Sequence, residues 1–468
     1  MLFRFIFFGK SRNAAIFGSN LCYDLAMHYD LILKNGTIVT PKENFKADIA
    51  IKNGKIVKTG RLENSCSADD IYDAVGMYIL PGIIDAHVHF RDPGLTEKEN
   101  FETGSIAAAF GGITTIADMP NTVPVTSNLL RFNEKTCIAK EKSCVDFALF
   151  ALLPNESAEI EALKRAGALG FKVFLGTSTG DIAPPSQPVL FEQMKVCAEA
   201  GIRIGFHAET SALNLYFTSL CAKKTGSPGQ LLSEARPIFS EALAIQTAIC
   251  YARYSGAKIH IHHVTSLDGV QLIAEAKQKG INVTAETCPH YLLLNVENRA
   301  HKVYPPIRGE DHRKALWKAI DEGIIDMIAS DHAPHTKKEK ELPVWEAPAG
   351  LCGTETLVPL MLNEVNRGNL SLNDFVRLTS ETPSKIWGIY PQKGNLLSGA
   401  DADFTVVDMN KKEKIDINEL HSKSKTSPYD GTEIQGKPIA TIVRGKFIMK
   451  DGRLLANKGF GNLVSPEL

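Results

Sequence analysis

The pattern of apolar and polar positions divides the chain into two β-rich ends around a long middle. Between residues 30 and 74, short runs alternate apolar with polar side chains, and Asn35-Gly36 and Asn53-Gly54 are typical hairpin signals between such runs. A matching pattern returns at residues 402–408 and 438–455. We expect the two ends to form one small β domain, since the termini of a domain often lie close together.

The middle of the chain repeats a different unit. Eight apolar runs of β type recur, and most are followed by a stretch with helical spacing, for example EIEALKRAG or LDGVQLIAEAKQKG. Alternating strands and helices are typical of a parallel sheet, and eight repeats favour a closed barrel. An open doubly wound sheet is the alternative, but no G-x-G-x-x-G motif follows the first strand.

The reactive side chains of this middle region favour the barrel. They fall at the C-terminal ends of the predicted strands, where barrel enzymes carry their chemistry. We therefore predict an α/β fold with a (β/α)8 TIM-like barrel over residues 81–394. Residues 28–80 and 395–460 are predicted to form a smaller β-sandwich domain from both chain ends. A chain of 468 residues is long enough for both.

Composition and charge exclude several classes of partner. The chain carries 52 basic and 53 acidic residues, so its net charge of −1 offers no general attraction to nucleic acid or to an anionic membrane. Nine cysteines without a C-x-x-C pair indicate a reduced, cytoplasmic protein and argue against a disulfide framework or a thiolate zinc site. No apolar run reaches the roughly 18 residues that span a bilayer.

The first 27 residues differ from the rest of the chain. They carry Arg4, Lys10 and Arg12 together with aromatic side chains, and no acidic residue precedes Asp24. A transit peptide has some of these features. The simpler interpretation is that translation starts at Met27 and that residues 1–27 are an upstream extension or a disordered arm.

Two histidines end the first strand of the predicted barrel. His87 and His89 are two positions apart, so their side chains project to the same side of an extended strand. Two imidazoles placed in this way can share one divalent ion. Surface or core histidines are the ordinary alternative, but the buried strand before the pair and the Pro-Gly turn after it favour a metal site.

Lys172 lies inside the apolar segment GALGFKVFLG, the fourth strand of the predicted barrel. Burying an ammonium group is costly, so a lysine in such a strand is rare unless it is paired. One interpretation is a lysine at the strand end whose amine reaches water. The other is a neutral or modified lysine near metal ions, because a protonated amine has no lone pair to donate.

Three further strand ends carry imidazole or carboxylate groups. His207 ends the fifth strand, and the sixth strand ends in KIHIHHVTS, where alternation places His260 and His262 on one face and His263 on the other. The pattern alone does not choose between His262 and His263 as a ligand. Asp331 ends the eighth strand, where a carboxylate can bind metal and accept a proton from water.

These motifs resemble the cyclic amidohydrolases, and among them the dihydroorotase family most closely. The resemblance extends from about residue 28 to residue 456. Its motifs are HVHFRDPG (87–94), FETGSIAAAFGGITTIADMPNT (101–122), GFKVFLG (170–176), HAE (207–209), HHVTS (262–266), ETCPHYL (286–292), YPPIRG (304–309) and SDHAPHT (330–336).

The resemblance implies a metal site with two zinc ions. His87, His89 and Asp331 would hold the first ion, and His207 and His263 the second. The choice of His263 over His262 comes from its place before Val-Thr-Ser in the family motif. Lys172, carboxylated on its amine, would bridge the two ions. The metal ions lower the pKa of bound water, so hydrolysis near neutral pH follows.

The resemblance also implies a substrate that carries a carboxylate. Arg91, Asn121 and His335 match the family's substrate contacts, and a guanidinium suits a planar carboxylate. Arg91 paired with Asp92, or Asn121 capping a turn, would be a purely structural alternative. One residue departs from the family pattern, because Tyr304 stands where the dihydroorotase family usually has asparagine.

The implied reaction is the reversible, zinc-dependent hydrolysis of L-dihydroorotate to N-carbamoyl-L-aspartate in de novo pyrimidine (UMP) synthesis. Asp331 would act as base and then as acid. Hydantoinases, including dihydropyrimidinase-like enzymes, and allantoinases are the alternatives; hydantoinases carry a tyrosine five residues after the bridging lysine, where this chain has Thr177. An inactive scaffold of aspartate transcarbamoylase is the non-enzyme alternative, which the complete ligand set opposes. We expect a homo-oligomer, a dimer or a tetramer, with an association with aspartate transcarbamoylase as a further expectation.

Overall fold

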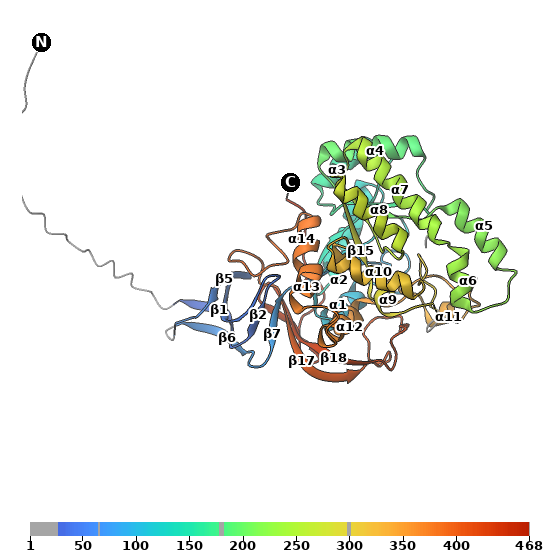
Figure 1. The fold of residues 1–468 in the computed structure, drawn as a ribbon. Helices are drawn as coiled ribbons and strands as arrows, with labels where there is room; N and C mark the ends of the chain where they lie inside the picture. The colour runs from blue at the N-terminus through green and yellow to red at the C-terminus, as the bar shows by residue number, and fades with distance from the viewer. Residues whose placement is uncertain (1–26, 64–65, 177–181, 297–300, 468) are drawn as a thin grey trace, which may run out of the picture.

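The computed structural model describes residues 27–63, 66–176, 182–296 and 301–467. The expectations for the N-terminal extension (residues 1–26) and for Thr177 therefore lie outside the described residues. The middle of the chain forms a barrel of parallel strands with helices around it (Figure 1). The barrel strands are β8 (Ile83–Val88), β9 (Ile113–Asp118), β10 (Asp146–Leu149) continued by β11 (Ala151–Leu152), β12 (Phe171–Phe174), β13 (Ile204–His207), β14 (Ile259–Ile261), β15 (Val283–Thr287) and β16 (Met327–Ile328).

Every pairing between neighbouring barrel strands is parallel, from β8–β9 through to β15–β16. The barrel closes where β8 meets the segment after β16, because Val88 forms a parallel bridge with His332 and the His89 N–H donates to the His332 carbonyl at 2.7 Å. An open sheet would leave these two edges unpaired. The predicted (β/α)8 barrel is therefore confirmed, and its two closing segments carry predicted metal ligands.

Helices connect the strands and cover the barrel. Several begin at side chains that cap the first turn: Asn100, Asn128 and Ser266 each accept a hydrogen bond from a backbone N–H three residues on. Among the described residues, no helix is long and apolar enough to cross a membrane. The helices are α1 (Phe101–Phe110), α2 (Leu129–Lys142), α3 (Ser157–Arg165), α4 (Gln187–Ala200), α5 (Ser211–Cys221), α6 (Pro228–Ala235), α7 (Ile238–Ser255), α8 (Leu267–Gln278), α9 (Pro289–Leu293), α10 (Glu310–Asp321), α11 (Lys337–Lys340), α12 (Thr354–Asn366), α13 (Leu372–Val376), a π-helical turn (Arg377–Glu381) and α14 (Thr382–Ile386).

The two ends of the chain form the predicted β-sandwich beside the barrel (Figure 1). One sheet has the strand order β5-β4-β1-β6, and the other has the order β20-β19-β18-β17-β7-β2-β3, so N-terminal and C-terminal strands share the second sheet. Apolar side chains from both sheets, such as Leu33, Ile51 and Phe404, form one core between them. The strands are β1 (His28–Lys34), β2 (Thr37–Val39), β3 (Asn44–Lys46), β4 (Asp48–Lys52), β5 (Lys55–Gly60), β6 (Ser67–Asp73), β7 (Tyr78–Pro81), β17 (Phe404–Lys414), β18 (Glu433–Val443), β19 (Lys446–Lys450) and β20 (Arg453–Leu454).

One of the two hairpin signals does not form a hairpin. Asn53-Gly54 joins the antiparallel strands β4 and β5 as expected. Asn35-Gly36 instead passes the chain from β1 in one sheet to β2 in the other. A Cβ atom at Gly36 would lie 2.5 Å from the Ile79 side chain, so the glycine is required by close packing between the sheets.

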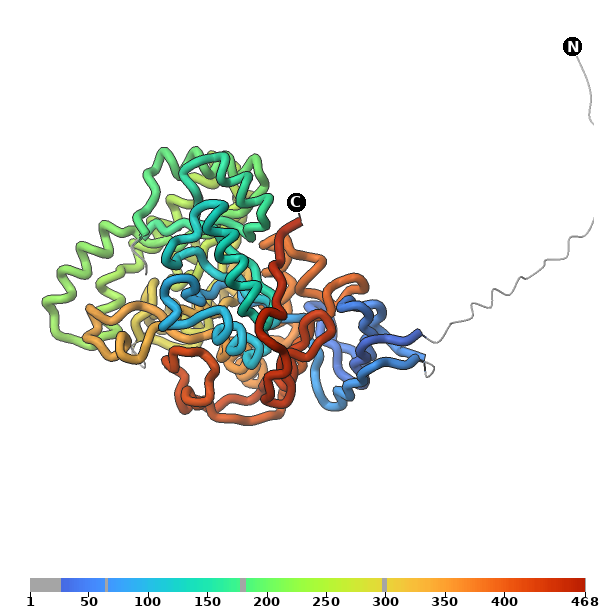
Figure 2. The backbone as a smooth tube through the Cα atoms, turned by 180° about the vertical axis from the view of Figure 1, so that it is seen from behind, coloured from blue at the N-terminus to red at the C-terminus, as the bar shows by residue number. Residues whose placement is uncertain are grey.

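The C-terminal segment ties the sandwich to the barrel. Beyond β20 the chain runs back along the barrel, as the red end of the tube in Figure 2 shows, and Leu463 forms a parallel bridge with Phe147 of β10. A buried ion-pair cluster lies nearby, in which the Lys393 Nζ contacts Asp146, Asp401 and Asp403 at 2.5 to 3.0 Å. These contacts fix the barrel base, away from the strand ends that carry the predicted site.

Candidate metal centre

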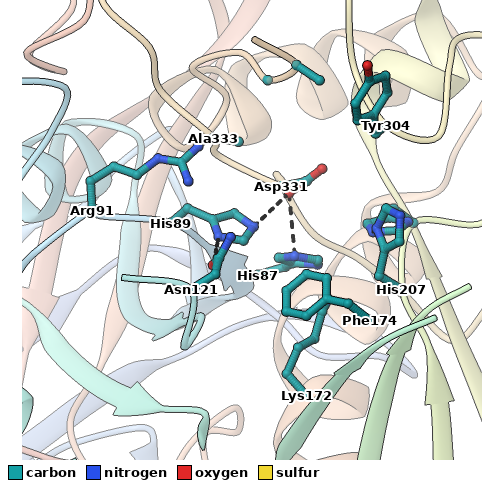
Figure 3. Close-up of a pocket in the computed structure, with 13 residues that line it drawn as sticks. His87, His89, Arg91, Asn121, Lys172, Phe174, His207, Tyr304, Asp331 and Ala333 are labelled. Carbon is teal, nitrogen blue, oxygen red and sulfur yellow. Dashed lines mark hydrogen bonds and ion pairs between the residues drawn. The ribbon is translucent and has the colours of Figure 1, made fainter. Parts of the chain in front are cut away.

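The six predicted metal ligands line one cavity at the C-terminal ends of the barrel strands (Figure 3). They come from strands far apart in the sequence, and the closed barrel brings them together. This is the position at which barrels of this type carry active sites. The ligands that the cavity gathers are His87, His89, Lys172, His207, His263 and Asp331.

His87, His89 and Asp331 form one group of ligand atoms. The Asp331 Oδ1 lies 3.4 Å from His87 Nε2 and 3.3 Å from His89 Nε2, as the dashed lines in Figure 3 show. Two ligand atoms bound to one tetrahedral zinc ion at 2.0–2.1 Å lie about 3.3 Å apart. The group therefore fits a divalent ion, and the three side chains are nearly fully buried.

His207 and His263 form a second pair on the opposite wall. His207 Nδ1 lies 3.0 Å from His263 Nε2, and the His263 Nδ1 has no hydrogen-bond partner among the described residues. Burial lowers the pKa of both imidazoles, which keeps them neutral and leaves lone pairs for a metal ion. His262, the rival that the sequence left open, points away from this cavity toward Glu286.

Three residues of the site have left-handed backbone conformations, which are uncommon outside glycine. Arg91 has φ +62°, His263 φ +39° and Asp331 φ +44°. Each lies just past the end of a barrel strand, where a change of backbone direction turns its side chain out of the ordinary alternation. Strained conformations of this kind concentrate at functional sites.

Lys172 is completely buried in β12, so the interpretation in which its amine reaches water is wrong. Its Nζ has no hydrogen-bond partner among the described residues. Burial lowers the pKa of Lys172 to about 7, although the carboxylates of Glu286 and Asp331 act in the opposite direction. A neutral, unpartnered amine between two sets of imidazoles is the state that can react with carbon dioxide and become an anionic ligand.

Glu286 is a site residue that the sequence analysis missed. Its carboxylate accepts hydrogen bonds from His87 Nδ1 at 2.5 Å, His262 Nδ1 at 2.9 Å and His260 Nε2 at 3.1 Å. Burial raises the pKa of this carboxyl well above its ordinary range. The signal was present, because Glu286 is a carboxylate near the end of a predicted strand, in the motif ETCPHYL.

Glu286 also belongs to a second group of close ligand atoms. Those of His87, His262 and Glu286 lie within 4.8 Å of one another, as do those of His87, His89 and Asp331. Because His87 belongs to both groups, the second group is an alternative use of its ring and not a separate set of ligands. Carboxylates that accept the distal N–H of a metal-binding histidine orient that ring and increase its basicity. The Glu286 contact with His87 has this geometry.

A buried chain of polar contacts leads from His207 to the cavity wall. His207 Nε2 donates to Glu209 at 2.9 Å, and Arg236 Nε donates to the same carboxylate at 2.9 Å. Burial alone would raise the pKa of Glu209, but Arg236 and His207 hold it well below its usual range. The Arg236 guanidinium lies 3.5 Å from the centre of the Tyr304 ring, which lines the cavity.

Two of the three predicted substrate residues line the cavity, and the third lies behind them. Arg91 and Asn121 border the cavity, and Asn121 Oδ1 lies 2.6 Å from His89 Nδ1. His335 is buried and contacts Arg91 Nη2 at 3.3 Å. Asp92 pairs with Lys142 at 2.7 Å, so the alternative in which it pairs with Arg91 is wrong.

The Arg91 guanidinium keeps a hydrogen-bond donor that no described residue uses. Its Nε donates to the Pro334 carbonyl, but its buried Nη1 has no hydrogen-bond partner among the described residues. Burial and the nearby cations Arg91, Lys98 and Lys340 lower the pKa of His335 to about 2. His335 is therefore a neutral neighbour that adds no charge beside Arg91.

Comparisons with known proteins agree on the type of enzyme and differ on the substrate. A family model described as the amidohydrolase family matches residues 78–448. An L-hydantoinase of Paenarthrobacter aurescens is 36% identical over 93% of this chain and 98% of its own length. An allantoinase of Bacillus velezensis is 36% identical, covering 94% of this chain and 98% of its own length. A dihydroorotase of Methanosarcina acetivorans is also 36% identical, covering 93% of this chain and 95% of its own length.

Solved structures show the same architecture. The L-hydantoinase (dihydropyrimidinase) from Arthrobacter aurescens aligns with a TM-score of 0.90 and 36% identity over 93% of this chain and 100% of that chain. A dihydropyrimidinase from Brevibacillus agri NCHU1002 aligns with a TM-score of 0.86 and 30% identity over 92% and 98%.

Proposed function

The chain belongs to the amidohydrolase family and is a metal-dependent hydrolase of cyclic amide bonds, and from this premise we propose that its substrate is a cyclic ureide bearing a carboxylate, with L-dihydroorotate as the first candidate. The reaction would be reversible opening of the ring to N-carbamoyl-L-aspartate, a step of pyrimidine synthesis. The observation that carries this proposal is the unpaired, buried Arg91 Nη1 at the cavity.

The proposal includes two zinc ions. His87, His89 and Asp331 would hold one ion, His207 and His263 the other, and Lys172 carboxylated on Nζ would link the two sets. The ligand-atom separations of 3.0 to 3.4 Å and the unpartnered Lys172 Nζ support this assignment. When bound, the metal ions supply a Lewis acid and lower the pKa of a water molecule.

Asp331 has the position of a proton carrier. Burial alone would raise its pKa, but the hydrogen bond from His89 and the nearby His290 and Lys172 hold its pKa below the ordinary value, so it is ionised at neutral pH. It would accept the proton that water loses on attack at the ring carbonyl and return that proton to the departing ring nitrogen. Its Oδ1 faces His87 and His89, and its carboxylate borders the cavity where the ring would lie.

Arg91 would bind the carboxylate of the substrate. Leaving a buried guanidinium N–H unpaired is costly, and a planar carboxylate is the group that matches it. Asn121 lies on the same side of the cavity, next to His89, and would help to orient the ring (Figure 3). Because the net charge of the chain is only −1, recognition of an anion depends on such local groups.

A neutral ring of the hydantoin type is the second candidate, and the similarity comparisons favour it. The solved structures described above are hydantoinases or dihydropyrimidinases. The sequence match to the L-hydantoinase extends over 98% of that enzyme's length. Tyr304 also favours it, because an aromatic ring on the cavity wall suits an apolar substituent. An allantoinase would likewise bind an uncharged ring.

One assay with matched variants tests the substrate. Purified protein is given L-dihydroorotate, hydantoin, dihydrouracil and allantoin side by side, together with the variants Arg91→Gln and Arg131→Gln, the second being an exposed arginine on α2. The proposal expects dihydroorotate to have the highest kcat/KM, with a loss of at least a hundredfold in R91Q and none in R131Q. Preferred turnover of a neutral ring, unaffected by R91Q, would overturn it in favour of the second candidate.

A further inference from the structure

A chain of polar side chains runs through the barrel from the metal centre toward the N-terminal ends of the strands. The interior of such a barrel is normally filled by branched apolar residues. Here Thr284 and Glu286 lie two positions apart on β15, so they project to the same side of the strand. His260, on the neighbouring strand β14, contacts both of them. Polar groups buried in this way cost free energy unless each finds a hydrogen-bond partner.

The chain begins at Arg203, which directly precedes β13 at the end of the barrel opposite the metal centre. Arg203 Nη1 donates to the Thr284 hydroxyl oxygen at 3.3 Å and to the Ile259 carbonyl at 2.7 Å. Its Nη2 donates to the Asn282 side chain at 3.0 Å. A guanidinium group can only donate hydrogen bonds, so the Thr284 oxygen is the acceptor of this contact. The direction of the first link is therefore fixed.

The remaining links lead from Thr284 to one of the candidate metal ligands. The Thr284 hydroxyl oxygen lies 2.9 Å from His260 Nδ1, and His260 Nε2 lies 3.1 Å from Glu286 Oε2. The other carboxylate oxygen, Oε1, lies 2.5 Å from His87 Nδ1. His260, Glu286 and His87 are each at most 1% exposed, so bulk water does not compete for these contacts.

The fixed first link determines the direction of every later one. The Thr284 hydroxyl has a single proton, and its nearest acceptor is His260 Nδ1, because the Ile259 carbonyl is more distant at 3.3 Å. His260 then carries its hydrogen on Nε2 and donates it to the Glu286 carboxylate. The same carboxylate accepts the Nδ1 hydrogen of His87, which leaves the lone pair of His87 Nε2 for a metal ion in the cavity.

His262 also contacts Glu286, but it does not extend the chain. Its Nδ1 lies 2.9 Å from the carboxylate, and its Nε2 has no hydrogen-bond partner among the described residues. The far side of the His262 ring is therefore not held by a second contact, whereas Thr284 holds the far side of the His260 ring. Of these two imidazoles, His260 is the one that connects Glu286 to Arg203.

We propose that Arg203 and Thr284 are positioning residues that set the tautomer of the metal ligand His87 from the opposite end of the barrel. The inference rests on the proposed function, in which His87 holds a zinc ion. A carboxylate partner orients a zinc-binding histidine and increases its basicity, and loss of such a partner weakens zinc binding by about 10–100-fold. Because Thr284 acts one step further away, through His260, we expect the lower end of that range.

The zinc affinity of three full-length variants tests this proposal. Thr284→Val keeps the shape of the side chain but removes the hydroxyl, whereas Thr284→Ser keeps the hydroxyl. Thr115→Val is the matched control, because Thr115 is a buried threonine of β9 whose hydroxyl has no hydrogen-bond partner among the described residues. Competition with a zinc chelator at neutral pH should give T284V a dissociation constant about tenfold higher for one of its two ions. T284S and T115V should both keep the wild-type affinity.

A double variant tests whether Arg203 acts through the same chain. Arg203→Met should weaken the same ion at least as much as T284V, and the double variant R203M/T284V should bind zinc no more weakly than R203M alone. Losses that add would show that the two residues act separately and would overturn the proposal. If R203M does not fold, the comparison of T284V with T284S decides alone.

The remaining outcomes separate this proposal from the proposed metal centre. Unchanged zinc affinity in T284V, with or without a lower melting temperature, would overturn the positioning role and leave the metal centre in place. An equal loss of affinity in T284V and T284S would also overturn it, because the hydroxyl would then not be the group that matters. A wild-type protein that binds no zinc would overturn both.

Discussion

His207 Nδ1 and His263 Nε2 lie 3.0 Å apart, although His207 ends β13 and His263 follows the end of β14. Burial keeps both rings neutral. Their nitrogen atoms converge on the cavity that also holds Lys172 and Asp331. Two imidazole nitrogens at this separation can share one metal ion when each ring directs its lone pair at the ion.

The contrast between His263 and its neighbour His262 gives the first prediction. His263→Asn should lower the zinc content of the purified protein from two ions per chain to about one, because it removes a ligand of the second ion. His262→Asn should keep both ions, because that side chain donates to Glu286 and does not border the cavity. Metal analysis by mass spectrometry provides the measurement. Loss of one ion in H262N with two ions retained in H263N would assign the second ion to the group of His87, His262 and Glu286.

Lys172 gives a prediction about pH. Its amine must be neutral to react with carbon dioxide, and burial lowers its pKa to about 7. The neutral fraction is then about 10% at pH 6 and about 90% at pH 8. Metal-free protein is reconstituted with zinc at one fixed concentration of dissolved carbon dioxide. Reconstitution should proceed about tenfold faster at pH 8 than at pH 6.

The control for this experiment is protein that already holds its metals, incubated and assayed in parallel. It should keep its activity during the same incubation at both pH values, since its lysine is already modified. Equal reconstitution rates at pH 6 and pH 8 would argue against a titrating amine. Reconstitution that needs no dissolved carbon dioxide would argue against carboxylation.

Asp331→Asn tests the proton carrier. An amide keeps the shape of the side chain but accepts no proton, so kcat should fall by about 10² to 10⁴ while KM changes by a few-fold. Because Asp331 also faces His87 and His89, turnover must be expressed per fully metal-loaded chain. Near-normal kcat in a loaded variant would show that another group carries the proton.

The ion-pair cluster at the barrel base gives a prediction about stability. Lys393→Met removes the buried cation that contacts Asp146, Asp401 and Asp403, and should lower the free energy of unfolding by about 3–5 kcal/mol because the carboxylates are left uncompensated. Lys55→Met is the matched control, since Lys55 contacts Asp401 from the surface and should cost less than about 1 kcal/mol. Urea denaturation measures both, and equal effects would contradict the account.

The strand order of the barrel could be predicted from the sequence, because apolar runs and helical spacing report burial directly. The turn at Asn35-Gly36 could not be assigned in the same way. A left-handed Asn followed by glycine is compatible with a hairpin and also with a crossing between sheets, and only packing against Ile79 decides between them. Local pattern carries no information about such a contact.

The sequence predicted the candidate ligands that line the cavity, but it did not predict their supporting contacts. His87 and His89 follow strand alternation, whereas His263 takes part through a left-handed backbone that no alternation rule anticipates. The pairing of Glu209 with Arg236, and of Glu286 with three imidazoles, joins residues distant in sequence. Such contacts form only when the barrel closes. The local sequence pattern around each residue does not reveal which distant residue it will meet.

The central claim is that this chain hydrolyses a cyclic amide with metal ions held by six converging side chains. Its most direct test is ring-opening activity measured with zinc content, before and after dialysis against a chelator and after zinc is restored. The account predicts about two ions per chain, loss of at least a hundredfold in turnover without them, and recovery with them. Full turnover by protein that holds less than a tenth of an ion per chain would contradict it.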